Sequence, residues 1–205
     1  MNMARKTWIA KFFSTVCVLV LTLALALPAA AAEPPLDDAT KAVYYAAYQE
    51  IVDEINAKYG GGVELRPMDE LSEEDWLKPA EFRQLLEDIR NWELHWVTEP
   101  STRSSVSATK TATASAFGKS YTFRVTGRFT THLSGNRQVF HSIDSLTSSL
   151  SSTTGSWRQT GYEHAFLDLS RTCFVTVSGR LTAAAATTTV VFDVEFYCNS
   201  TGTVT

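Results

Sequence analysis

Two segments with alternating polarity near the C-terminus constrain the fold of this chain most strongly. From residue 173 to 183 the apolar side chains occupy odd positions, and from 190 to 198 they occupy even positions. A period of two is typical of a β-strand with one buried face. We therefore predict that these segments form an antiparallel hairpin that buries both apolar sets on the same side.

The register of this hairpin determines where its cysteines lie. Folding the two segments about a turn centred between Ala185 and Ala186 gathers the apolar residues on one face, and a slip of one residue would expose half of them. The same register places Cys173 directly opposite Cys198. Because a non-hydrogen-bonded antiparallel pair has a Cα spacing that a disulfide tolerates, we predict a Cys173–Cys198 disulfide.

The N-terminus has the features of a secretory signal peptide. The basic residues Arg5, Lys6 and Lys11 precede an apolar run over residues 12–27, and four alanines follow at 29–32. A basic segment, a short apolar segment and an Ala-x-Ala site together are typical of a cleaved export signal. We predict a signal peptide over residues 1–32, a secreted or cell-surface protein, and no membrane span after cleavage.

The cysteine count agrees with export. The chain has three cysteines, and the signal peptide contains one of them, Cys17. The remaining two are what an exported protein with a single disulfide is expected to carry.

Charge divides the rest of the chain into two regions. Residues 33–100 contain 17 acidic and 6 basic residues, a net charge of −11, whereas residues 101–205 contain 5 acidic and 9 basic residues, a net charge of +4. The composition changes at the same place, from Glu, Asp, Leu and Trp to Thr, Ser, Val and Arg. We predict an acidic helical region over 33–100 and a Thr/Ser-rich antiparallel β domain over 101–205.

Two helices are expected in the acidic region. Apolar residues recur at steps of three and four over residues 38–59, and the glycines at 60–62 end that pattern. Pro79 suits the first turn of a second helix that we expect to reach about Trp96. Two antiparallel helices, a helical hairpin, are the simplest product.

One helical pattern resembles a known group of proteins. It reads Tyr48-x-x-Ile51-x-x-Glu54-Ile55-Asn56-x-x-Tyr59-Gly60. It resembles a helical stretch of uncharacterised secreted proteins of Gram-positive bacteria. The resemblance covers residues 48–60, supports export and implies no activity.

The β domain is expected to contain about six strands. Phe192 is expected to cover Gly179, an arrangement in which an aromatic ring shields a strand glycine. Short connections between the strands favour an antiparallel β-sandwich or flattened barrel. The fold class is therefore α+β, with a helical hairpin before a disulfide-linked β domain. The expected strands are 105–115, 119–133, 137–149, 157–168, 172–183 and 188–198.

The outward faces of the strands suggest a binding surface. Arg124 and Arg128 lie two positions apart on one face of a strand, among threonines, and Arg180 occupies the matching place in the other hairpin. If these strands are neighbours, the three arginines form a flat Thr/Arg surface for carboxylate, phosphate or sulfate groups of an envelope polymer or a protein partner. The alternative is a solvated sheet face against which the acidic helices dock. A net charge of −7 after residue 32 and the lack of a recognisable motif argue against nucleic acid.

The sequence contains no clear motif for catalysis or metal binding. His132 and His141 flank a turn and could approach each other, but no third ligand is spaced to complete a zinc site, so we predict no metal and no cofactor. Glu163, His164 and Asp168 leave a hydrolase open as the alternative. A glycosidase pair could also come from the carboxylates of this region, among which spacing selects none: Asp144, Glu163, Asp168, Asp193 and Glu195.

From these observations we predict a secreted, non-enzymatic binding or interaction module. The alternative function is a secreted hydrolase with a carboxylate or histidine site. A third possibility is that residues 33–100 form an inhibitory or chaperoning segment that masks the basic sheet.

Overall fold

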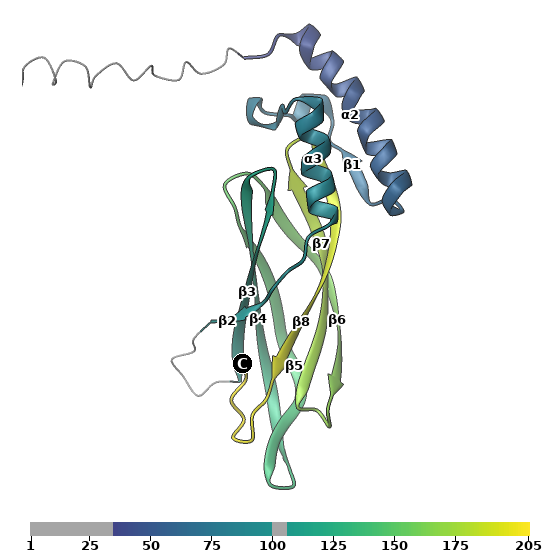
Figure 1. Ribbon diagram of the computed structural model, residues 1–205. Helices are drawn as coiled ribbons and strands as arrows, with labels where there is room; N and C mark the ends of the chain where they lie inside the picture. The colour runs from purple at the N-terminus through teal and green to yellow at the C-terminus, as the bar shows by residue number, and fades with distance from the viewer. Residues whose placement is uncertain (1–34, 100–105) are drawn as a thin grey trace, which may run out of the picture. The chain divides into compact units, whose positions relative to one another are not determined.

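The computed structural model describes residues 35–99 and 106–205 (Figure 1). The predicted signal peptide at 1–32 and the boundary between the two predicted regions near residue 100 lie outside these residues. Residues 36–205 form one compact unit. Within the described ranges, no helix has the length and apolar character needed to cross a membrane.

The first described helix, α2, runs over Asp38–Tyr59, as the sequence predicts. The Asp37 carboxylate accepts a hydrogen bond from the Thr40 amide at 2.7 Å and so caps the first turn. The helix ends at Gly60, whose φ of 80° is a left-handed conformation that glycine adopts without strain. The α2 side chains that become buried include Tyr48 and Ile55.

The second helix, α3, covers Pro79–Arg90, with Asn91 as its C-cap. It is shorter than predicted. The expected extension to about Trp96 is wrong. The residues beyond Asn91 alternate instead of following a helical period, and Trp92, Leu94 and Trp96 all pack against the core of the β region. Burial of these three large side chains against the strands therefore outweighs the extra turn of helix.

The two helices contact each other. The rings of Tyr48 on α2 and Phe82 on α3 have centroids 4.2 Å apart. Their predicted antiparallel pairing stays a prediction. Helix α3 also joins the core of the β region through Leu85 and Ile89, whereas its Phe82 and Leu86 lie in a second buried cluster with residues of α2.

The described strands form two antiparallel sheets of four strands each, with orders β1-β8-β7-β6 and β2-β3-β4-β5. All six predicted strands are confirmed, with ends within a few residues. Two short strands from the acidic region, β1 and β2, extend one sheet each. The strands are β1 (Val63–Leu65), β2 (Val97–Thr98), β3 (Ser107–Ala116), β4 (Lys119–Ser134), β5 (Arg137–Ser151), β6 (Ser156–Leu167), β7 (Thr172–Ala183) and β8 (Ala186–Tyr197).

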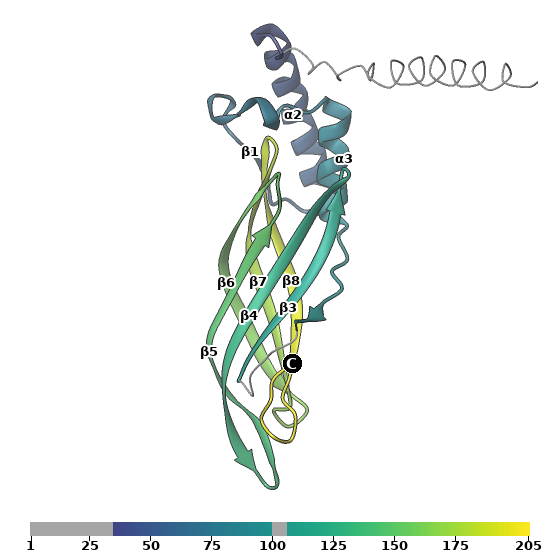
Figure 2. The ribbon, with the colours of Figure 1, turned by 90° about the vertical axis from the view of Figure 1, so that its left-hand side faces the viewer.

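The inner faces of the two sheets contact each other through aromatic side chains. Phe123 lies 5.3 Å from Phe192 and Phe129 lies 5.0 Å from Phe196, measured between ring centroids. Helices α2 and α3 lie at one end of the strands, and the β4–β5 hairpin extends at the other end (Figures 1 and 2). Because the inner faces are apolar, the polar residues of each alternating strand point outward.

The β7–β8 hairpin has a different register from the predicted one. Ala183 pairs with Ala186, and Cys173 pairs with Phe196. The strands are therefore displaced by two residues from the predicted pairing. A displacement of two keeps every side chain on its own face, so the alternation of polarity is equally consistent with both registers.

This displacement makes the disulfide prediction wrong. Cys198 lies beyond the end of β8, where it bridges to Val204, and no longer faces Cys173. Both cysteines are free and buried. Burial raises the pKa of the Cys173 thiol to about 12, and burial also raises the pKa of Cys198.

A tryptophan, and not Phe192, covers the strand glycine. A Cβ atom at Gly179 would lie 2.4 Å from ring atoms of Trp157. Gly179 pairs with Val190 on β8 and with Gln159 on β6. The expected aromatic cover exists, but the neighbouring strand β6 supplies it.

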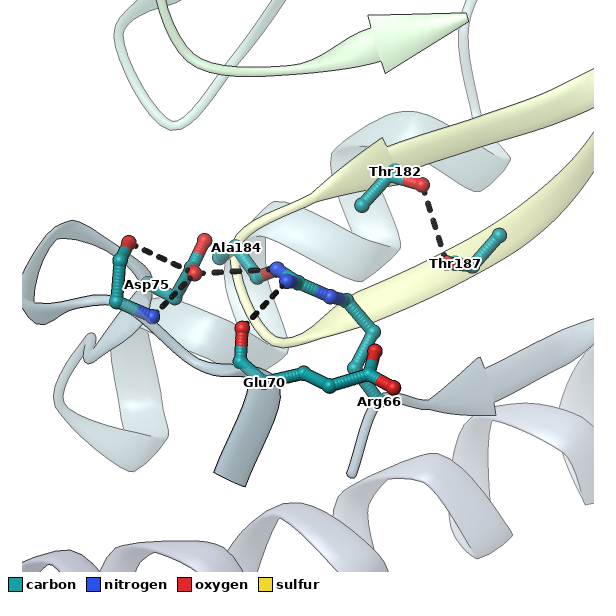
Figure 3. Close-up of polar contacts among 7 residues, drawn as sticks. Arg66, Glu70, Asp75, Thr182, Ala184 and Thr187 are labelled. Carbon is teal, nitrogen blue, oxygen red and sulfur yellow. Dashed lines mark hydrogen bonds and ion pairs between the residues drawn. The ribbon is translucent and has the colours of Figure 1, made fainter. Parts of the chain in front are cut away.

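Arg66 attaches the acidic region to the β7–β8 turn (Figure 3). Its guanidinium donates hydrogen bonds to the carbonyl oxygens of Ala184 at 3.1 Å and Glu70 at 2.8 Å. The same group lies 3.1 Å from a carboxylate oxygen of Asp75. One half-buried cation thus contacts two backbone carbonyls and one carboxylate.

Candidate binding site

The outer face of the β2-β3-β4-β5 sheet carries regular rows of hydroxyl groups. The strand register of β3, β4 and β5 places one residue of each strand in each row. The hydroxyls of Thr109 and Thr126 lie 3.0 Å apart, and those of Thr113 and Thr122 lie 2.9 Å apart. The four rows are Ser107–Arg128–Ser145, Thr109–Thr126–Thr147, Thr111–Arg124–Ser149 and Thr113–Thr122–Ser151. Every position in these rows is Ser, Thr or Arg.

Arg124 and Arg128 are therefore outward on β4, as predicted. The Arg124 side chain is 56% exposed, and one of its nitrogens lies 2.8 Å from the Glu99 carboxylate. Among the residues that the structure describes, Arg128 makes no ion pair. Two guanidinium groups thus stand on a face whose other positions in these rows are neutral hydroxyls.

A hollow of about 670 Å³ lies over this face at Arg124. One wall comes from the segment before and through β2, with His95, Val97 and Glu99. The floor carries five hydroxyl side chains besides the guanidinium of Arg124, namely Thr111, Thr113, Thr122, Ser149 and Ser151. We call this hollow the Arg124 groove.

The chemistry of the Arg124 groove suits an anionic or polyhydroxylated ligand. A guanidinium is a planar donor that matches carboxylate and phosphate oxygens, and hydroxyls both donate and accept hydrogen bonds. Glu99 competes for the same guanidinium. A ligand that engages Arg124 must therefore share it with Glu99 or displace that carboxylate.

Arg180 is not part of this surface. It lies on β7, in the other sheet, where its two terminal nitrogens donate to the two Glu64 carboxylate oxygens of β1 at 3.0 and 2.6 Å. Hydrogen bonding and the charge of Arg180 lower the pKa of Glu64. Because β4 and β7 belong to different sheets, the predicted single surface of three arginines does not form.

The residues of the hydrolase alternative do not gather in a shared cavity. Glu163 and His164 are consecutive on β6 and so point to opposite faces of the sheet. Asp168 lies in the following turn and accepts a hydrogen bond from the Thr172 hydroxyl at 2.9 Å. None of these three lines the Arg124 groove or the cavity described next.

A second cavity, which sequence reasoning missed, lies where the acidic region meets the ends of the sheets. Its volume is about 710 Å³, and its lining includes Asp75, Leu85, Phe117 and Lys119. It also includes Tyr121, whose pKa burial raises. Its lining comes from segments far apart in the sequence, so no local pattern could have revealed it.

Comparisons with protein-family models, with curated proteins and with solved structures found no match for this chain.

Proposed function

We propose that this protein is a secreted, non-enzymatic binding module that recognises anionic groups of a cell-envelope polymer through the outer face of the β2-β3-β4-β5 sheet. The observation that carries this proposal is Arg124 in a groove that five hydroxyl side chains also line. The anionic groups are of the carboxylate, phosphate or sulfate class, because these are the groups that a guanidinium binds with two donors.

The spacing of the two cations favours a polymer over a small ion. Arg124 and Arg128 are four residues apart on one strand, which corresponds to about 13 Å at the usual rise of a strand. The hydroxyl rows between and beside them offer further hydrogen bonds at the separation of neighbouring strands, about 4.8 Å. An extended chain with repeated anionic and hydroxyl groups contacts both cations and the hydroxyls between them.

The charge of this face predicts weak, salt-sensitive binding. Arg124 already has an anionic neighbour in Glu99, and exposed charges are screened by salt within about 10 Å at 0.1 M ionic strength. Affinity therefore depends on several such contacts along one polymer.

Co-sedimentation with purified cell-envelope material tests the proposal. The matched control for Arg124→Ala/Arg128→Ala is Arg158→Ala/Arg180→Ala, which removes the same charge from the outer face of the other sheet. We expect binding at low salt that weakens at high salt, is lost in the first variant and is kept in the second. Absence of binding at low salt, or equal loss in both variants, would overturn the proposal.

The acidic region supports a second role, that of an intramolecular mask. Glu99 pairs with Arg124, and Glu64 pairs with Arg180, so two of the three arginines singled out from the sequence contact carboxylates of residues 33–100. We propose that Glu99 occupies the position that an anionic ligand takes at Arg124.

Replacing that carboxylate tests the mask. Glu99→Gln keeps the shape of the side chain and removes its charge, so it is expected to strengthen envelope binding. Glu64→Gln is the matched control on the other sheet and is expected to leave binding unchanged. Unchanged or weaker binding by Glu99→Gln would contradict the mask.

A further inference from the structure

Two histidines stand together on the β4–β5 hairpin, outside the Arg124 groove. His132 is on β4 and His141 is on β5, and both are exposed. Their ring centroids lie 5.3 Å apart, with the ring planes at 79°. This hairpin extends at the end of the strands opposite the helices (Figure 2).

The separation of the rings matches that of two imidazoles on one metal ion. A zinc–nitrogen bond of about 2.0–2.1 Å, a ring centre about 1.1 Å beyond the nitrogen and a tetrahedral angle of about 109° give a distance between ring centroids of about 5.2 Å. The observed 5.3 Å agrees with this value.

The backbone around this pair is held in place. The β4–β5 register shifts between Arg128 and Phe129 and again between Thr130 and Thr131, which changes the direction of the side chains near the hairpin end. On β5 the amide of Phe140 donates to the Ser170 carbonyl at 2.8 Å, and the amide of Gln138 donates to the Ser200 carbonyl at 3.0 Å. A fixed backbone lowers the entropy that two ligands lose on binding a metal.

We propose that His132 and His141 chelate one divalent transition-metal ion of the class that imidazole favours, Zn²⁺, Cu²⁺ or Ni²⁺. In the described part of the chain, no group of three or more His, Cys, Asp or Glu side chains is arranged to hold a metal. The ion therefore keeps coordination positions for water or for a donor of another molecule, as catalytic and bridging metal sites do and closed structural sites do not.

Calorimetric titration of the tag-free protein with ZnCl₂ tests this site. We expect one equivalent of zinc to bind. His132→Ala and His141→Ala are each expected to weaken zinc binding more than about tenfold, because even the loss of a group that hydrogen-bonds to a metal ligand typically costs about that much affinity. His164→Ala is the matched control on β6 and is expected to bind zinc as the parent protein does. Circular dichroism checks that each variant is folded.

A second measurement identifies the ligands directly. In histidine-ring NMR spectra, zinc is expected to shift the signals of His132 and His141 and to leave those of His164 unchanged. No zinc binding, equal binding by His132→Ala, or equal weakening in His164→Ala would overturn the proposal. The Arg124→Ala/Arg128→Ala protein is expected to keep its zinc site, so this test is independent of polymer binding.

Discussion

Replacing Gly179 with alanine tests how closely Trp157 on β6 packs over the strand glycine of β7. A Cβ atom there would lie 2.4 Å from Trp157 ring atoms and 2.7 Å from the Arg158 carbonyl oxygen. The Trp157 ring is held by contacts with Phe123 and Phe192 and by a hydrogen bond that its Nε1 donates to the Ser148 hydroxyl, and the carbonyl belongs to β6, which pairs with β7 along its length. Overpacking of this kind costs about 1–3 kcal/mol. We expect Gly179→Ala to lower the free energy of unfolding by that amount.

Gly161 provides the matched control. It lies on the same strand pair, next to the shift in register, and no atom lies within 4 Å of a Cβ built there. Gly161→Ala is expected to leave the protein equally stable or to raise the free energy of unfolding by up to about 1 kcal/mol, because alanine reduces the entropy of the unfolded chain.

Urea unfolding monitored by tryptophan fluorescence measures both variants. The expected result is two changes that differ by at least about 1 kcal/mol, with Gly179→Ala the less stable protein. A Gly179→Ala protein as stable as the parent, or an equal loss in both variants, would show that Trp157 does not cover Gly179 as described.

Three further predictions follow from named contacts. Both thiols, Cys173 and Cys198, are expected to be unreactive toward a thiol reagent at pH 8 in the folded protein and to react in denaturant, because burial raises both pKa values. If mass spectrometry shows either residue unlabelled after unfolding without reductant, the assignment of free cysteines is contradicted. Arg66→Ala is expected to lower the free energy of unfolding by about 1–3 kcal/mol, because it removes a half-buried ion pair and two hydrogen bonds. The ion pair of Arg83 with Glu54 is more exposed, so Arg83→Ala is expected to lower the free energy of unfolding by less than about 1 kcal/mol. If urea unfolding shows that Arg83→Ala and Arg66→Ala lose equal stability, this expectation is wrong.

The strands could be predicted well because alternation is a local property. β4 and β7 reveal their inner faces in their own residues, because both place apolar side chains at odd positions. The first helix was equally clear, since its apolar period, its Asp37 cap and its terminal glycines agree. Local patterns of this kind determine which segments form which elements.

The register of β7 and β8 could not be predicted in the same way. Pairing Cys173 with Phe196 or with Cys198 leaves the same side chains inside, so the pattern does not choose between them. The choice depends on the turn, which holds only Ala184 and Ala185 between paired Ala183 and Ala186. Ala184 has a φ of 47°, a left-handed conformation that is uncommon for alanine and that the sequence therefore does not predict.

The end of α3 shows how tertiary contact overrides a helical pattern. Trp92, Leu94 and Trp96 fit a continuing helix less well than an extended segment with alternate residues buried, and this alternation was the available signal. The Trp92 ring contacts Tyr121 and Phe123, and the Trp96 ring contacts Phe192, all distant in sequence.

The candidate site was predictable only in part. Outward arginines among threonines follow from alternation, so Arg124 and Arg128 were identified correctly as surface residues. Which sheet each strand joins depends on pairing between distant segments, and for this reason Arg180 was wrongly grouped with them. Glu99 lines the Arg124 groove and pairs with Arg124, although it belongs to the predicted acidic region. Its position beside β4 depends on contacts between distant segments.

We propose that the outer face of the β2-β3-β4-β5 sheet binds an anionic envelope polymer. Amide NMR spectra of the isotope-labelled protein, recorded during addition of a solubilised anionic envelope fraction, test it most directly. We predict that the largest shift changes occur at Thr111, Thr122, Arg124 and Ser149, around the Arg124 groove. Shift changes confined to the other sheet, or to the cavity beside Lys119 and Tyr121, would contradict the claim.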